Sequence, residues 1–170
     1  MAESGPVLVL IGAPASGKSR IGKRVAKLLD VPFIDTDKTI VAEHGAISAM
    51  FEQHGEPHFR AIERVHVQRA LHEHAVVALG GGAVLDESTQ ADLEPLLVAQ
   101  LTVHASAVAG RNLGANRPLL AGGIDAWTKL VAERAPLYDR LADATFDTSS
   151  LSAERVASDI ADWVRGETHD

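Results

Sequence analysis

A glycine-bounded loop near the amino end of the chain carries the residue types that bind phosphate. Its sequence, GAPASGKS from Gly12 to Ser19, matches the pattern G-x-x-x-x-G-K-[ST]. Glycines allow a tight turn in which backbone N–H groups converge on an anion. Lys18 can bridge the β- and γ-phosphates of a nucleotide, and the Ser19 hydroxyl can ligate Mg²⁺. The loop therefore predicts a site for a nucleoside triphosphate.

Two carboxylates, Asp35 and Asp37, are separated by one residue in the segment FIDTD. If the chain stays extended there, both side chains leave the backbone on the same side. One could hold Mg²⁺ while the other accepts the proton of an acceptor hydroxyl. The alternative is structural, with Asp37 capping a helix and Asp35 a solvated acid. These two residues alone do not decide between the interpretations.

Arginine and glycine residues further along could complete an acceptor site. Arg60 and Glu63 lie three apart, so on a helix they form either a local ion pair or a guanidinium held ready for a substrate carboxylate. Three glycines, Gly80, Gly81 and Gly82, follow an apolar segment. Such a run indicates that the backbone approaches a ligand or another segment closely.

A polar, glycine-rich segment over about 111–123 is predicted to be a mobile lid. Arg117 within it precedes Pro118 and is biased to an extended backbone. A lid that carries arginines would exclude water and bring positive charge to a transferring phosphoryl group.

Histidine and tryptophan residues are expected to have structural roles. The eight histidines include the pair His54 and His58, four apart, but a structural zinc site would need further ligands in a tetrahedral arrangement. Trp127 and Trp163 fall on apolar helical stripes and are expected to pack in or near the core.

The elements that must position these groups alternate between strand and helix. This alternation predicts an α/β fold, a three-layer α/β/α sandwich with a mostly five-stranded parallel sheet. Ligands of such sheets bind at the carboxyl ends of the strands, where the loop glycines, the two aspartates and the glycine run fall. The strands are expected at about 7–11, 31–35, 75–79, 100–105 and 144–148, and the helices at 18–29, 37–45, from 57 onward, 86–97, around Pro136 with a kink or break, and 152–166.

Bulk composition limits the class of protein. The chain has 170 residues, of which 46% are apolar, so one domain over residues 1–170 is expected. Its formal net charge of −7 argues against a nucleic-acid partner, because binding a phosphate backbone requires a concentrated basic face. There is no cysteine, which excludes disulfides and thiolate metal sites. The amino end has neither a basic leader nor a membrane-spanning run, so a cytoplasmic protein without a membrane partner is expected.

Taken in order, the segments GAPASGKS, FIDTD, FRAIE, LGGGAV, RPLL and ERAPLY resemble those of the shikimate kinase family. The resemblance covers most of the chain and implies a P-loop, nucleoside-monophosphate-kinase-like fold. It implies transfer of the ATP γ-phosphoryl group to the 3-hydroxyl of shikimate, on the route to chorismate and aromatic amino acids. It also implies ATP and Mg²⁺ as cofactors and a substrate-binding helical segment at about 36–64; we expect a monomer.

Residue roles follow from the same resemblance. It implies that Lys18, Asp37 and Arg117 are catalytic, with Asp37 as the candidate base, and that Ser19 and Asp35 hold the metal. The ATP-binding set would be Gly12, Ala13, Ala15, Ser16, Gly17, Lys18, Ser19, Arg20, Arg111 and Arg117. The shikimate-binding set, in which the arginines bind the carboxylate, would be Asp37, Phe51, Phe59, Arg60, Gly80, Gly81, Gly82 and Arg134.

Two other functions are considered beside this one. Gluconate also combines one carboxylate with several hydroxyls, so Arg60 and Arg134 alone do not exclude a gluconate or other small-polyol kinase. A nucleotide-binding regulatory module without phosphotransfer is the alternative outside enzymes. In the segment DTSSLSA, serines, Leu151 and Ala153 replace residues that often frame adenine in the family, so the base preference is not determined by the sequence.

Overall fold

A computed structural model describes residues 5–109 and 122–168, and its centre is a parallel sheet of five strands in the order β2-β3-β1-β4-β5. Asp35 of β2 pairs with Ala78 of β3, and Leu10 of β1 pairs with the same alanine. The segments that follow these three strands therefore leave the sheet at one edge. The strands are β1 (Leu8–Gly12), β2 (Phe33–Asp35), β3 (Val76–Ala78), β4 (Val98–Thr102) and β5 (Ala144–Asp147).

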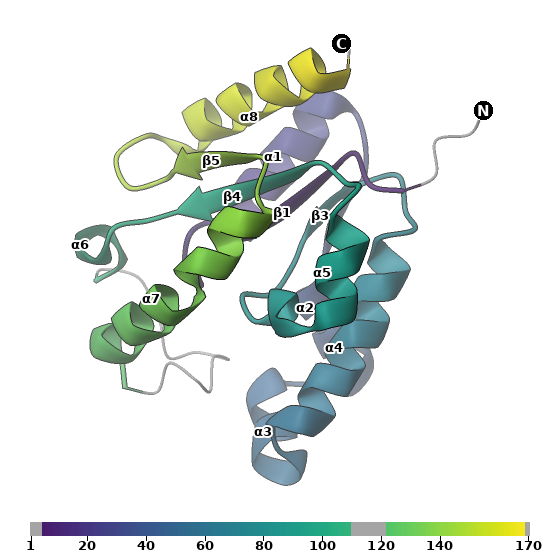
Figure 1. Ribbon diagram of the computed structural model, residues 1–170, viewed down its shortest axis with the longest axis vertical. Coiled ribbons are helices and arrows are strands. Elements are labelled where there is room, and N and C mark those ends of the chain that lie inside the picture. The colour runs from purple at the N-terminus through teal and green to yellow at the C-terminus, as the bar shows by residue number, and fades with distance from the viewer. Residues whose placement is uncertain (1–4, 110–121, 169–170) are drawn as a thin grey trace.

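Helices cover both faces of the sheet, which confirms the three-layer α/β/α prediction (Figure 1). Side chains of alternate strand residues point to opposite faces. Leu8 and Leu10 pack with α1 (Lys18–Leu29) and α8 (Ala153–Thr168). Val9 and Ile11 pack on the other face with α4 (Glu56–Ala70), α5 (Glu87–Leu93) and α7 (Ile124–Leu141). No helix within the described ranges is long and apolar enough to cross a membrane.

A smaller cluster holds three helices together beside the sheet. Ile40 of α2 (Thr36–His44), Ile47 and Met50 of α3 (Ile47–His54), and Phe59 of α4 form its buried centre. Figure 1 shows α3 at the end of α4 that is farthest from the sheet. The remaining elements are a short 3₁₀ turn, η1 (Ala83–Leu85), and α6 (Ala105–Val108).

The cap of α2 differs from the sequence prediction. The side chain of Asp35, not Asp37, accepts a hydrogen bond from Lys38 N, at 3.3 Å. The helix begins at Thr36 because β2 ends at Asp35, so its cap lies two residues earlier than the predicted one. Asp37 is thereby placed in the first helical turn, and the structural alternative for these two aspartates is wrong as stated.

Three predictions about the helices differ from the structure, and packing explains each difference. The chain stays helical through Pro136, so α7 is not broken there, and α8 continues past Gly166 to Thr168. A proline removes one hydrogen bond and a glycine costs about 1 kcal/mol, and neither ends a helix whose apolar face is buried. The apolar spacing of Phe59, Ile62 and Val65 predicts a buried stripe on α4. Val65 is instead 44% exposed, because the helix turns His66 and Val67 inward.

Two glycines in helices should respond oppositely to substitution. A Cβ added at Gly22 of α1 would meet the Phe33 ring and lie 3.1 Å from Leu10 Cδ1, whereas nothing lies within 4 Å of a Cβ at Gly166. We expect Gly22→Ala to lower the free energy of unfolding by about 1–3 kcal/mol through overpacking. Gly166→Ala should raise it by about 0.5–1 kcal/mol, since alanine loses less entropy in a helix. Urea unfolding measures both; equal effects would contradict the contact of α1 with the sheet.

Candidate functional site

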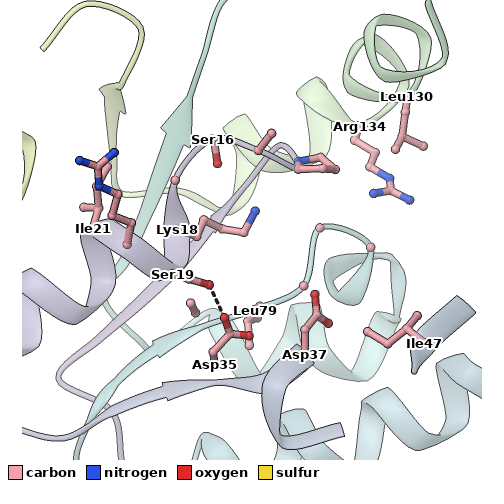
Figure 2. A pocket seen from close by; sticks show the side chains of 18 of the residues that line it. Ser16, Lys18, Ser19, Ile21, Asp35, Asp37, Ile47, Leu79, Leu130 and Arg134 are labelled. Carbon is pink, nitrogen blue, oxygen red and sulfur yellow. Dashed lines mark hydrogen bonds between the residues drawn. The ribbon is translucent and has the colours of Figure 1, made fainter. Parts of the chain in front are cut away.

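The edge where β1, β2 and β3 end opens into a cavity of about 540 Å³. Figure 2 shows Lys18, Asp37 and Arg134 pointing into this space from three different elements. Most of the residues expected to carry the chemistry line it. These are Ala15, Ser16, Gly17, Lys18, Ser19, Arg20, Asp35, Asp37, Phe51, Phe59, Arg60, Gly80, Gly81, Gly82 and Arg134.

Two described residues of the expected site, Gly12 and Ala13, are not in that lining. Gly12 and Ala13 lie at the base of the phosphate loop, and their carbonyl oxygens accept hydrogen bonds from Lys18 Nζ at 2.8 and 2.9 Å. A Cβ on Gly12, whose φ is 141°, would strike the Leu101 carbonyl oxygen of β4. Arg111 and Arg117, with most of the expected lid, lie outside the described residues.

Ala15 occupies the left-handed region of the backbone, with φ of 64°. For a residue with a Cβ this conformation costs about 1–2 kcal/mol, so neighbouring contacts must hold it. Trp127 Nε1 donates to the Pro14 carbonyl at 2.7 Å, and Thr148 Oγ1 donates to the Ser16 carbonyl at 2.8 Å. The loop is thus fixed on both sides of Ala15. Trp127 is buried as expected, and its hydrogen bond to the loop was not predicted.

The Ser19 hydroxyl donates to the Asp35 carboxylate, which joins the start of α1 to the end of β2 (Figure 2). A hydroxyl and a carboxylate are oxygen donors of the kind that Mg²⁺ prefers. Both groups line the cavity next to Lys18. The two residues expected to hold the metal are therefore in contact, and their donor set fits Mg²⁺.

The glycine run (residues 80–82) places bare backbone against three charged side chains. A Cβ added at the first glycine would lie 2.5 Å from Asp37 Oδ1. At the second it would lie 3.3 Å from Arg134 Nη1, and at the third 2.6 Å from Arg60 Nη1. Real Cβ atoms do not approach other atoms at the first and third of these distances. Side chains at the first and third positions would therefore displace Asp37 and Arg60, and one at the second would crowd Arg134 and Pro14.

Arg60 is held by two carboxylates of its own helix. Its Nη1 lies 2.8 Å from Glu63 Oε1, and its Nε lies 3.2 Å from Glu56 Oε2. Glu63 is buried, and burial raises its pKa above the ordinary value, opposed by Arg60 and increased further by Asp37. The ion pair weighed from the sequence is therefore present, and it fixes the position of the guanidinium.

Arg134 enters the cavity from α7 and is 6% exposed. One turn later, the Tyr138 hydroxyl donates to the Gly81 carbonyl at 2.6 Å, which ties α7 to the glycine run. Burial raises the pKa of Tyr138, and the adjacent charge of Arg134 opposes the shift. The apolar spacing of the segment around Pro136 predicts for Tyr138 only a packing position on this helix. Its spacing of four from Arg134 was the available signal for a role at the site.

An aromatic wall closes the side of the cavity formed by α3 and α4. The rings of Phe51 and Phe59 lie 5.1 Å apart, and the Arg60 guanidinium lies 5.3 Å from the Phe59 ring centre. Ile47 of α3 and Leu130 of α7 also line the cavity and were not among the expected site residues. The cavity thus combines apolar side chains with charged ones, which suits a small polar ring.

Comparison with known proteins identifies the family. The model of the shikimate kinase family matches residues 14–165. The shikimate kinase of Salinispora tropica is 46% identical over 92% of this chain and 96% of its own length. That of Thermobifida fusca is 44% identical over 93% and 94%. The chain belongs to the shikimate kinase family. This confirms the resemblance seen in the ordered sequence motifs.

Solved structures of shikimate kinases share the fold of this family member. The enzyme from Acinetobacter baumannii in complex with shikimate has a TM-score of 0.88 at 28% identity, covering 96% of this chain and 94% of that one. The Aquifex aeolicus enzyme gives 0.80 at 27% identity, covering 95% and 97%. A gluconokinase from Sinorhizobium meliloti gives 0.59 at 18% identity, covering 95% and 97%, which is a likeness of fold alone.

The raised pKa of Glu63 should appear in the pH dependence of stability. Between the ordinary value of 4.5 and the raised one, the native state binds more protons than the unfolded state. The contribution of this group to the free energy of unfolding therefore falls as pH rises through that window. Glutamine does not titrate. The free energy of unfolding of Glu63→Gln minus that of the wild-type protein should therefore increase as pH rises from 4.5. Urea unfolding at several pH values tests this; a constant difference would contradict it.

Proposed function

We propose that this member of the shikimate kinase family transfers the γ-phosphoryl group of ATP to the 3-hydroxyl of shikimate. The observation that carries the proposal is the convergence of Asp37, Arg134 and Arg60 on the glycine run, beside the phosphate loop. Shikimate has one carboxylate and ring hydroxyls, so it requires cations and a hydrogen-bond acceptor together. The cavity offers both within reach of a bound triphosphate.

On the nucleotide side, the loop from Gly12 to Ser19 would bind the phosphates through its N–H groups and the start of α1. Lys18 would move from the loop carbonyls to the β- and γ-phosphates. Ser19 and Asp35 would hold Mg²⁺, which supplies neutralisation of phosphate charge when bound. Arg111 and Arg117 keep their expected roles, near adenine and on the phosphates, as part of the proposal.

On the acceptor side, Arg60 and Arg134 would bind the carboxylate, with Glu63 fixing the pose of Arg60. Asp37 would accept a hydrogen bond from the acceptor hydroxyl and take its proton as the phosphoryl group arrives. The role of Asp37 in proton transfer is secondary to orientation, because phosphoryl transfer depends chiefly on positioning and charge. Phe51 would pack against the ring.

The wider expectations become part of the same proposal. We assign residues 1–170 to one kinase domain, with the acceptor bound by the helical segment at about 36–64 and a lid at about 111–123. The three helices around Ile40 and Phe59 support the acceptor segment, because their shared core holds Asp37 and Arg60 on one body. A monomer in the cytoplasm stays a prediction.

The first experiment is to measure ADP release from Mg·ATP with shikimate, with gluconate and without an acceptor. We expect turnover that depends on shikimate. Turnover with gluconate alone would favour a small-polyol kinase. The support for that function is a likeness of fold to a gluconokinase. Nucleotide binding without turnover on either acid would favour the regulatory module, against which stands the presence of Lys18, Asp37 and both arginines in one cavity.

The carboxylate contact predicts a specific kinetic change in Arg134→Lys. Lysine keeps the charge but loses the planar fork that binds a carboxylate with two hydrogen bonds. A lost hydrogen bond to a charged group is worth about 1.5–3 kcal/mol, so the KM for shikimate should rise roughly tenfold or more. The KM for ATP should stay near that of the native protein. Steady-state kinetics with each substrate varied in turn separates the two effects.

Arg140→Lys is the matched control. Arg140 lies on the same helix, and its Nη2 donates to Gln90 Oε1 at 3.0 Å on the exposed surface, away from the cavity lining. Its substitution should leave both KM values unchanged. An Arg134→Lys enzyme with the native KM for shikimate would remove Arg134 from the carboxylate site.

A further inference from the structure

Three potential metal ligands converge where the end of α2 meets the middle of α4. Glu43 and His44 stand at the end of α2, and His66 lies in the middle of α4. One ligand atom from each residue lies within 4.8 Å of the others. In residues 5–109 and 122–168, no other set of three histidine or acidic side chains meets this criterion. None of the three lines the cavity of the kinase site.

The tautomer of His66 follows from its hydrogen bonds. Thr39 Oγ1 lies 2.9 Å from His66 Nδ1 and also donates its single hydrogen to the Thr36 carbonyl, at 2.8 Å. A hydroxyl has one hydrogen to donate, so toward the imidazole the Thr39 oxygen can only accept. With Thr39 donating to the Thr36 carbonyl, the proton of the neutral imidazole is assigned to Nδ1 of His66. In the neutral ring, Nε2 is then the nitrogen with a free lone pair.

That nitrogen is buried without a hydrogen bond. His66 is 4% exposed, and Nε2 has no hydrogen-bond partner although Glu43 Oε2 is only 3.1 Å away. A lone pair facing a carboxylate oxygen is repulsive, and a proton on Nε2 would not be aimed at that oxygen. A cation placed between the two atoms, off the line that joins them, would satisfy both. The absence of a hydrogen bond at His66 Nε2 therefore indicates that a cation, not a hydrogen, satisfies this nitrogen.

Glu43 and His44 also direct ligand atoms toward the position beside His66 Nε2. Glu43 Oε1 accepts from Arg69 Nη1 at 3.4 Å, which leaves Oε2 directed at the histidines. Oε2 lies 3.6 Å from His44 Nε2, and the two imidazole rings meet edge to face with centres 5.6 Å apart. Tetrahedral zinc with bonds of about 2.1 Å separates neighbouring ligand atoms by about 3.4 Å, close to both measured separations. Thr39 contacts the second ring nitrogen of His66, and Arg69 donates to the second carboxylate oxygen of Glu43. Hydrogen bonds of this kind orient the ligands of metal sites.

We propose that Glu43, His44 and His66 bind a divalent transition ion of the zinc class, which joins the end of α2 to α4. Two imidazole nitrogens and one carboxylate suit Zn²⁺, Co²⁺ or Ni²⁺ better than Mg²⁺, which prefers oxygen. Arg69 offsets the charge of Glu43, so affinity depends on the nitrogen ligands. Water completes the coordination, because His44 and Glu43 are 38% and 54% exposed. The site is independent of the phosphoryl-transfer proposal.

Metal titration of the chelator-treated protein tests this site. Zn²⁺ is titrated by calorimetry and Co²⁺ by visible absorption, in millimolar Mg²⁺ to saturate the oxygen ligands of the kinase site. We expect one equivalent of each ion to bind, the intense visible bands of four-coordinate Co²⁺ to appear, and Zn²⁺ to raise the thermal midpoint. Absence of one-equivalent binding, or its displacement by Mg²⁺, would overturn the proposal.

His44→Gln is the decisive variant because His44 is partly exposed and its loss should not unfold the protein. It should weaken Zn²⁺ binding at least tenfold and abolish the Co²⁺ bands, as should Glu43→Gln. His72→Gln is the matched control, since that exposed histidine is engaged through Nδ1 by the Gln68 carbonyl and lies outside the cluster. Equal Zn²⁺ affinity in His44→Gln and His72→Gln would show that the ion binds elsewhere.

Discussion

The site depends on the close approach of three charged side chains to the backbone after β3. The register of the sheet places Asp35 beside Ala78, so Asp37 and Gly80, each two residues further on, meet beyond the edge. Thr36 secures this meeting, because its buried hydroxyl donates to the Ala78 carbonyl and accepts from Gly80 N. The guanidinium groups of α4 and α7 then fill the space beside the next two glycines. A side chain in the run would push these charged groups from the positions that they occupy.

Charge balance in the cavity explains why two arginines are present. Asp37 and Glu63 both contribute negative charge, and each raises the cost of bringing another carboxylate near. Arg60 is already engaged by Glu63 at 2.8 Å, so part of its charge is neutralised before a ligand binds. Arg134 lies beside the neutral Tyr138 hydroxyl, and its charge also acts on Glu63. In the proposed complex with an acidic ligand, the two arginines together offset the two carboxylates.

Local signals in the sequence predicted the parts, and long-range contacts decided how they meet. The phosphate motif and the apolar spacing placed the helix over 18–29 with its bounds correct, and the ordered motifs identified the family. The role of Asp35 as a cap depended on where β2 ends, which packing sets. The bonds from Tyr138 to Gly81 and from Trp127 to Pro14 join residues 57 and 113 positions apart, and no local pattern predicts such pairs. The convergence of Glu43 and His66 likewise depends on how α2 lies against α4.

The conformation of the phosphate loop is imposed by contacts with other segments of the chain. Ala15 adopts a conformation that glycine would adopt freely, so the isolated segment would favour another path. The two side chains that hold the carbonyls on either side of it come from α7 and from the residue after β5, both late in the chain. Trp127 is on the helix that also carries Arg134, so the loop and the arginine proposed to bind the carboxylate share one support. A shift of α7 would therefore alter the proposed nucleotide and acceptor sides together, because both depend on a single helix.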